Sequence, residues 1–292
     1  MYYIYGVICH RLTSPLTFTV NQLANCTQNI IIIHVDKKLG EKEFNLMKKC
    51  FSSLSNVLFL EERHDVRWGS ISQIDVMLML LKKAQDYDFK YISLISGDDI
   101  PLMSNKTRNN FLDIAYENRA EFIGTEADCK KYYNRINIKH PSFMFKKDRS
   151  FLKKMMCKII NLYNRKYNKL DLTNFPEVYK GASWFTISNF AVDYIFKYLR
   201  LNKDYYNYFL YSFCGDEIFF QTILFNSDFK KNIKFDDNES IMSMRYIDWV
   251  SGPDYPRTLN EDDFEKIKNS QMLFARKIKS DSLVNLVKYL EI

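Results

Sequence analysis

Asn29-Ile30-Ile31-Ile32-Ile33-His34-Val35-Asp36 is the stretch of this sequence that decides the fold. Four consecutive isoleucines predict a β-strand covered on both faces, because a strand with one wet face would alternate apolar and polar residues. Strands of that kind are typical of parallel sheets that carry helices on both sides. The stretch therefore predicts an α/β protein.

The neighbouring segments repeat the alternation of strand and helix. Strands are predicted at residues 2–9, 56–60 and 91–95, and helices at residues 15–24, 41–51 and from the capping-box pattern Ser70-Ile71-Ser72-Gln73 onward. Such β-α-β alternation builds a twisted, mainly parallel sheet flanked by helices, and ligands bind outside the carboxyl ends of its strands. Asp36 and Asp99 both follow strand ends, where that rule expects a site.

The rest of the chain is less regular. Residues 128–180 predict long loops with one basic helix near residues 151–167, and loops of that length usually carry function. Strands are predicted at residues 181–187 and 244–249, a helix after a cap at Ser188, another helix at residues 260–269, and a short apolar-basic segment at 273–278. No repeat or flexible linker divides the 292 residues, so a single domain is predicted.

Composition excludes several classes of protein. Only 8 glycines are present, and neither a dinucleotide-binding nor a P-loop pattern occurs. The net charge of +7 fits an anionic ligand, an anionic polymer or a membrane surface, although the cations are spread along the chain in local clusters. No nucleic-acid-binding module is recognisable, so nucleic acid is not an expected partner.

The six cysteines show no CxxC pair and no spacing typical of zinc. The start of the chain lacks a basic leader, and no run of 18 apolar residues follows. We therefore expect reduced thiols and a cytoplasmic protein, with peripheral contact at the inner face of the plasma membrane left open.

The chemistry is expected at Ser212-Phe213-Cys214-Gly215-Asp216-Glu217-Ile218, where a loop becomes an apolar helix. Asp216 or Gly215 would cap the helix, and Glu217 would project from its first turn as a general base. The alternative is that an acidic first turn only complements the helix dipole.

The other candidates follow from what is absent. No serine nucleophile motif or histidine metal pattern occurs, His34 is more typical of a structural histidine, and Asp98-Asp99 is not a spaced metal-binding pair. Arg257 and Lys277 could hold a diphosphate, or they could be surface charges. Trp68 and Trp249 could stack on a sugar or base, or belong to the core, and Trp184 is expected in the core or the wall of a cleft.

Eight short segments, in order, resemble the core-2/I-branching β-1,6-N-acetylglucosaminyltransferase family (glycosyltransferase family 14), which also includes the peptide O-xylosyltransferases. They span about residues 1–280 and are Ile33-His34-Val35-Asp36-Lys37-Lys38, Val66-Arg67-Trp68-Gly69, Leu94-Ile95-Ser96-Gly97-Asp98-Asp99-Ile100-Pro101-Leu102, Gly181-Ala182-Ser183-Trp184-Phe185, Asp216-Glu217-Ile218-Phe219-Phe220-Gln221-Thr222, Arg245-Tyr246-Ile247-Asp248-Trp249, Pro256-Arg257-Thr258 and Leu273-Phe274-Ala275-Arg276-Lys277.

The resemblance implies a GT-A-like α/β fold, a UDP-sugar donor, inversion at the anomeric carbon and no metal cofactor. By resemblance Glu217 is the general base, and Arg257 and Lys277 neutralise the UDP diphosphate. The other UDP-sugar residues are expected to be Asp36, Trp68 and Gly69, and the acceptor-binding residues Asp99, Trp184 and Trp249. Residues 1–125 would form the nucleotide-binding half and residues 126–292 the acceptor-binding and catalytic half.

The chain departs from the animal members, because it lacks their N-terminal anchor and disulfide pattern. The expected reaction is transfer of β-linked GlcNAc to a glycan or lipid-linked oligosaccharide during synthesis of a bacterial surface polysaccharide. The alternatives are a xylosyltransferase that uses UDP-xylose and a non-catalytic carbohydrate-binding protein.

Overall fold

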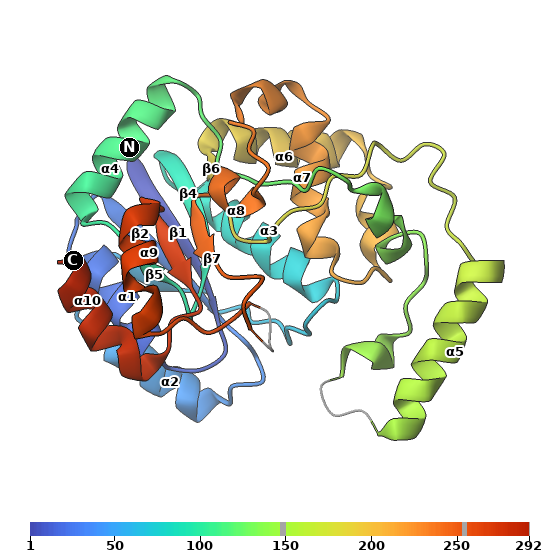
Figure 1. Cartoon of the computed structure of the whole chain (residues 1–292), viewed down its shortest axis with the longest axis horizontal. Coiled ribbons are helices and arrows are strands. Elements are labelled where there is room, and N and C mark those ends of the chain that lie inside the picture. The colour runs from blue at the N-terminus through green and yellow to red at the C-terminus, as the bar shows by residue number, and fades with distance from the viewer. Residues whose placement is uncertain (147–149, 253–255, 292) are drawn as a thin grey trace.

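A computed structural model describes residues 1–146, 150–252 and 256–291 (Figure 1). Its central sheet has five strands in the order β3-β2-β1-β4-β6. They are β1 (Tyr2–Cys9), β2 (Asn29–Val35), β3 (Val57–Phe59), β4 (Phe89–Ser96) and β6 (Thr186–Ser188). The first four strands are parallel, and β6 pairs antiparallel with β4. The predicted α/β fold with a mainly parallel sheet is confirmed.

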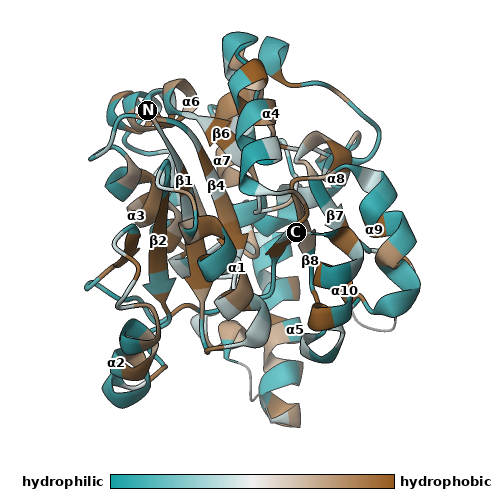
Figure 2. Cartoon of the chain, turned by 90° about the vertical axis from the view of Figure 1, so that its left-hand side faces the viewer, coloured by the Kyte–Doolittle hydropathy of each residue, from teal (hydrophilic) through white to brown (hydrophobic). Residues whose placement is uncertain are grey.

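The isoleucines of β2 divide between two cores. Ile31 and Ile33 pack with helices α1 (Ser14–Ala24), α2 (Glu41–Cys50) and α4 (Asn105–Glu117). Ile30 and Ile32 face the opposite side, where α3 (Ser72–Ala84), α6 (Asn189–Leu201) and α7 (Phe219–Phe225) pack. Because every side chain of the strand enters one core or the other, the run has no polar position until His34, and the central strands are largely brown in Figure 2.

A smaller sheet packs beside the first. Its strands, in the order β5-β8-β7, are β5 (Ile100–Pro101), β8 (Phe274–Arg276) and β7 (Arg245–Ile247). It is covered by α9 (Phe264–Ser270) and α10 (Leu283–Leu290), which share an apolar cluster with it. The remaining helices are α5 (Phe151–Tyr167), α8 (Glu239–Met242) and the 3₁₀ turns Lys130–Arg135, Ser142–Phe145, Tyr206–Phe209, Gly215–Glu217, Asp228–Asn232, Glu261–Asp263 and Ser280–Ser282.

Three details of the sequence reading are wrong. The strand predicted at 181–187 is only Thr186–Ser188, and Trp184 before it lines a cavity instead. The capping box at Ser70 does not form, since the side chain of Gln73 bonds to Gly69 and Asp216 instead. Helix α4 was not predicted, because its apolar residues are sparse.

The main sheet joins the two predicted halves of the chain, because β6 of the second half pairs with β4 of the first. His34 is fully buried and accepts a hydrogen bond from the His64 backbone, as a structural histidine does. Among the described residues, no helix has the length and apolar character that crossing a bilayer requires.

Candidate active site

A cationic cavity of about 210 Å³ lies at the carboxyl ends of β1 and β4, where a parallel sheet is expected to bind its ligand. Strand β1 leads into Arg11 on its rim, β4 leads into Gly97 and Asp98, and β8 leads into Arg276 and Lys277. Three cations therefore meet at one edge of the fold. Such a set suits phosphate oxygens, which accept hydrogen bonds from Arg and Lys.

Arg276 is fixed from two sides. Its guanidinium lies over the Trp184 ring at 4.6 Å, and its Nε lies 3.4 Å from Asp99 Oδ1. The Asp99 carboxylate also accepts hydrogen bonds from the Ser96 backbone and hydroxyl, at 2.9 and 2.6 Å. Asp99 is fully buried, so the predicted contact between Asp99 and an acceptor does not fit this structure. The residue instead positions Arg276.

Two hydrogen bonds connect this cavity to the predicted catalytic segment. Asp216 Oδ2 accepts from Gln73 Nε2 at 3.2 Å and from Ser183 Oγ at 2.6 Å. Gln73 lines the cavity, and Ser183 immediately precedes Trp184, which also lines it. Glu217 is thus one residue away from the side chain that ties the segment to the cavity.

The segment itself is a tight turn. Cys214 has φ 50°, and residues Gly215–Glu217 form a 3₁₀ turn before α7 begins at Phe219. The expected helix cap is therefore wrong: Asp216 is buried and bonds to Gln73 and Ser183 rather than to the helix. The predicted accessibility of Glu217 is only partial, since 24% of its side chain is exposed.

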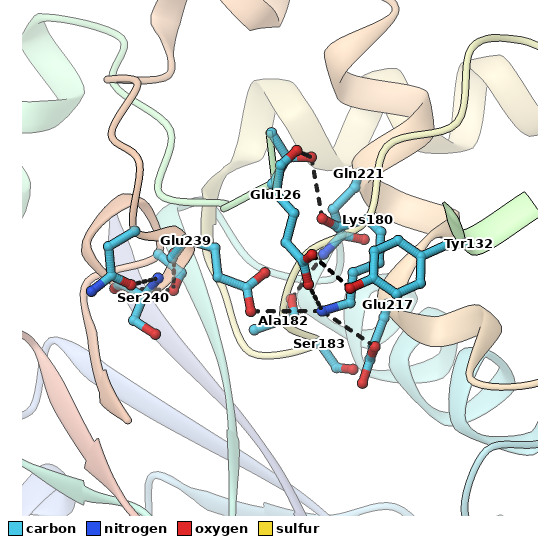
Figure 3. A network of polar contacts seen from close by, with 12 residues as sticks. Glu126, Tyr132, Lys180, Ala182, Ser183, Glu217, Gln221, Glu239 and Ser240 are labelled. Carbon is cyan, nitrogen blue, oxygen red and sulfur yellow. Dashed lines mark hydrogen bonds and ion pairs between the residues drawn. The ribbon is translucent and has the colours of Figure 1, made fainter. Parts of the chain in front are cut away.

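Lys180 gathers three carboxylates, one of which belongs to Glu217 (Figure 3). Its Nζ lies 2.7 Å from Glu126, 3.6 Å from Glu217 and 3.7 Å from Glu239. Arg135 Nη1 donates a hydrogen bond to Glu217 Oε2, at 2.6 Å. Two cations thus fix the carboxylate of Glu217 in one orientation.

Charge and burial oppose each other in this network. Burial alone would lower the pKa of Lys180, but its three carboxylate partners outweigh burial and raise that pKa above its usual value. Burial also favours the neutral form of Glu126, yet hydrogen bonds from Lys180 and Tyr132 lower its pKa to about 2. The Glu239 pKa is raised, mainly by burial.

Asp216 behaves differently from its neighbour in sequence. Complete burial, and then the charge of Glu217, raises the pKa of Asp216 to about 7. Its Oδ1 has no hydrogen-bond partner among the described residues. Asp216 is therefore a positioning group inside the protein, not an alternative base that faces substrate.

Glycine allows the loops around Lys180 to approach one another. A Cβ on Gly181 would lie 1.9 Å from the carbonyl oxygen of Gly124, and a Cβ on Gly124 would lie 2.3 Å from the carbonyl oxygen of Glu239. Any larger residue at either position would separate the backbones. The close approach brings Lys180 and Glu239 from distant parts of the sequence to one place.

The other residues predicted to bind the UDP-sugar, Asp36, Trp68 and Gly69, lie in two different places. Trp68 is exposed and makes an edge contact with Phe213 at 5.5 Å, while Gly69, with φ +76°, accepts a hydrogen bond from the Cys214 backbone at 2.8 Å. Both therefore lie against the turn that carries Glu217. Asp36 is buried at the end of β2, and its carboxylate is bound by the Lys38 backbone and ammonium.

Arg257 is not a free cation in this structure. Its Nε lies 2.8 Å from Asp248 Oδ2, and a second guanidinium nitrogen pairs with Asp263. Arg257 is not among the residues that line the cavity, whereas Lys277 is. Trp249 follows Asp248 in the same loop and is 40% exposed. Lys277 and Trp184 thus line the cavity, whereas Arg257 and Trp249 do not.

Sequence reasoning missed Arg135, Lys180, Glu126 and Glu239. Lys180 directly precedes the Gly181-Ala182-Ser183-Trp184 segment, so its neighbours gave a signal. The other three lie in stretches without regular periodicity. Among the described residues, no group of three or more His, Cys, Asp and Glu side chains is placed to hold a metal ion.

The sheet thus carries a cationic cavity that suits phosphate oxygens and, linked to it, a carboxylate held by two cations. The sequence matches the profile of the family described as Core-2/I-Branching enzyme over residues 5–273. The chain belongs to this family. The resemblance stated from the eight segments is confirmed.

More distant likenesses occur among solved structures. The crystal structure of S. aureus TarS has 17% identity over 42% of this chain and 21% of that chain, with a TM-score of 0.30. S. aureus TarS 1-349 in complex with UDP has 16% identity over 42% of this chain and 34% of that one, also with a TM-score of 0.30. The chain thus spans well under half of these TarS chains. Among curated proteins, none matches the sequence.

Proposed function

We propose that this protein is a glycosyltransferase that inverts the anomeric carbon, needs no metal ion, and transfers a β-linked GlcNAc from UDP-GlcNAc to a glycan hydroxyl. The observation that carries the proposal is the link from Glu217 through Asp216 and Gln73 to the cationic cavity. An inverting transfer needs the base and the diphosphate site on opposite sides of the anomeric carbon. The hydrogen bond from Gln73 to Asp216 would hold the proposed base and the cavity at a constant separation.

Glu217 is the proposed base. It takes the proton of the acceptor hydroxyl while that oxygen forms a bond to the anomeric carbon, and the bond from that carbon to the diphosphate breaks on the opposite face. Arg135 and Lys180 hold the carboxylate of Glu217 by hydrogen bond and charge, at 2.6 and 3.6 Å. A single displacement forms no covalent enzyme intermediate, which agrees with the absence of a nucleophile motif.

The cavity is the proposed site of the leaving diphosphate. Lys277 supplies an ammonium, and Arg276 presents a guanidinium that lies against Trp184 and Asp99. Fixed cations at developing negative charge stabilise a transition state without reorganisation. Arg257 would join them only by releasing Asp248 and Asp263. Mutation of Arg257 tests whether it does so.

Two other functions make different predictions. A xylosyltransferase would use UDP-xylose in the same site, and the shape of the sugar pocket decides between them. A non-catalytic carbohydrate-binding protein would not require a carboxylate held by two cations beside a diphosphate cavity. The acceptor is expected to be a surface polysaccharide or lipid-linked oligosaccharide.

A thermal-shift panel of UDP, UDP-GlcNAc and UDP-xylose, each with and without EDTA, tests the proposal. A ligand that binds only the folded state stabilises it by about 2.7 kcal/mol at a hundredfold excess over Kd, and so raises the Tm. We expect UDP and UDP-GlcNAc to raise the Tm equally with and without EDTA. A shift that disappears with EDTA would overturn metal independence, and a shift with UDP-xylose alone would favour the xylosyltransferase.

A further inference from the structure

Helix α5, Phe151–Tyr167, stands at the edge of the molecule, away from the main sheet (Figure 1). Eight of the 24 large hydrophobic side chains exposed in the described residues belong to this one helix of 17 residues. They are Phe151, Leu152, Met155, Met156, Ile159, Leu162, Tyr163 and Tyr167. So large an apolar surface exposed to solvent is uncommon unless it binds a partner.

Helix α5 is amphipathic, but its apolar side faces solvent instead of the body of the protein. Its inward side is formed by Cys157, Asn164 and, partly buried, Ile160 and Asn161. Asn164 donates a hydrogen bond to the Lys139 carbonyl at 2.6 Å. A helix that covers a core normally turns its apolar side inward. Here a narrow side with two asparagines, Cys157 and Ile160 holds the helix to the body, and the larger apolar side faces out.

The charge of the helix indicates what kind of surface its apolar side would bind. It contains Lys153, Lys154, Lys158, Arg165 and Lys166 and no acidic residue. At 3.6 residues per turn, Lys154, Lys158 and Arg165 form one row along an edge of the apolar side. Cations that border an apolar stripe match an interface between acyl chains and anionic headgroups.

The surrounding segment has the same character. Residues 128–170 contain 13 of the 42 Lys and Arg but only 2 of the 35 Asp and Glu, which gives this segment a net charge of +11 and leaves −4 for the rest of the chain. The net charge of the protein is therefore concentrated here, although the other 29 of the 42 Lys and Arg are spread along the rest of the chain. A second copy of the same surface would be repelled by this charge.

We propose that α5 is a membrane-docking helix that lies in the plane of an anionic lipid surface, with its apolar side in the headgroup boundary and its cations at the phosphates. The proposal does not rest on the reaction. It does concern the site, because Arg135, which holds Glu217, belongs to the same basic segment, residues 128–170. Docking at that position would face the catalytic half toward a lipid-linked acceptor.

Vesicle co-sedimentation with the full chain tests the proposal. We expect binding to vesicles that contain about 30% phosphatidylglycerol, weak binding to pure phosphatidylcholine, and a loss of binding at high salt. The variant Leu152→Gln/Ile159→Gln/Leu162→Gln should bind at least tenfold more weakly, since each apolar side chain removed from the interface costs roughly that factor. Equal binding of this variant and wild type would overturn the proposal.

The chain offers a matched control. Leu201 on α6 is 73% exposed and Leu162 is 69% exposed, so Leu201→Gln makes the same change on another helix and should leave vesicle binding unchanged. Lys154→Gln/Lys158→Gln/Arg165→Gln should weaken binding to anionic vesicles by about a hundredfold at low salt, and binding to neutral vesicles much less. All these side chains are exposed, so each variant should keep the wild-type Tm.

Two results would assign the helix to another partner. Self-association in sedimentation velocity that disappears in the Leu152→Gln/Ile159→Gln/Leu162→Gln variant, without any vesicle binding, would show that a second copy covers the apolar side. Binding to duplex DNA that depends on the three cations but not on the three apolar residues, again without vesicle binding, would show a nucleic-acid surface.

Discussion

Replacing Glu217 by glutamine tests the proposed chemistry most directly. Glutamine has nearly the same shape, and its amide oxygen can still accept the hydrogen bond from Arg135. It cannot take a proton from the acceptor hydroxyl. We expect kcat to fall by roughly 10²–10⁴, the range for loss of a general base, or about 3–5 kcal/mol of activation free energy.

The effect on stability should be much smaller. The variant exchanges one charge-assisted hydrogen bond for a neutral one and weakens the 3.6 Å ion pair with Lys180. Because Glu217 is partly exposed, this should cost about 1–2 kcal/mol, well below the stability of a typical domain. UDP affinity should not change, because Glu217 does not line the cavity. Calorimetric UDP titration and thermal melts check both points.

Glu239→Gln is the matched control for charge. Glu239 contacts the same Lys180 at 3.7 Å, so its neutralisation changes the network charge equally while leaving the carboxylate at position 217. We expect this variant to keep kcat within about tenfold of wild type. The assay is UDP release from the donor with acceptor present, under conditions where chemistry limits the rate. The reasoning is refuted if Glu217→Gln keeps more than about a tenth of wild-type kcat, or if both variants lose activity alike.

Three further outcomes follow from the site. Lys277→Ala should weaken UDP binding by roughly ten- to a hundredfold, with or without EDTA, in calorimetric titrations; an equal loss in Arg257→Ala would show that its guanidinium leaves its two carboxylate partners for the phosphate. Trp249→Ala should raise the acceptor KM with little effect on UDP affinity, whereas a large fall in Tm would identify the ring as structural. Asp216→Asn should keep most activity, since its carbonyl oxygen can accept both hydrogen bonds. Burial raises the Asp216 pKa from 3.8 to about 7, so between these pH values the folded state binds more protons than the unfolded state, and the wild type loses stability as the pH rises. Asparagine does not titrate, so calorimetry should show the Tm of Asp216→Asn rising relative to that of the wild type from pH 5 to 8. Parallel curves of Tm against pH for the two proteins would contradict the assignment.

Sequence determined the α/β class and most of the elements. Periodicity and burial pattern are local properties, so β1, β2 and the helix at residues 151–167 could be placed within a residue or two. The ordered segments also gave the family, which the profile match over residues 5–273 confirms. Glu217 was singled out from its place before an apolar helix, and its catalytic role stays a prediction.

Only the tertiary structure decided what surrounds that carboxylate. Lys180, Glu126 and Glu239 come from three segments of the chain and meet because Gly124 and Gly181 let those backbone segments touch. The pairing of Arg257 with Asp248 and Asp263 likewise depends on loop geometry that no periodicity encodes.

Direction is the other property that the sequence could not supply. The pattern of α5 predicts an amphipathic helix, but which side faces the body depends on what the rest of the chain presents to it. The structure places the polar side inward, by the hydrogen bond from Asn164 to Lys139, and leaves the apolar side exposed. Periodicity fixes which residues share a face, and tertiary packing alone decides where that face points.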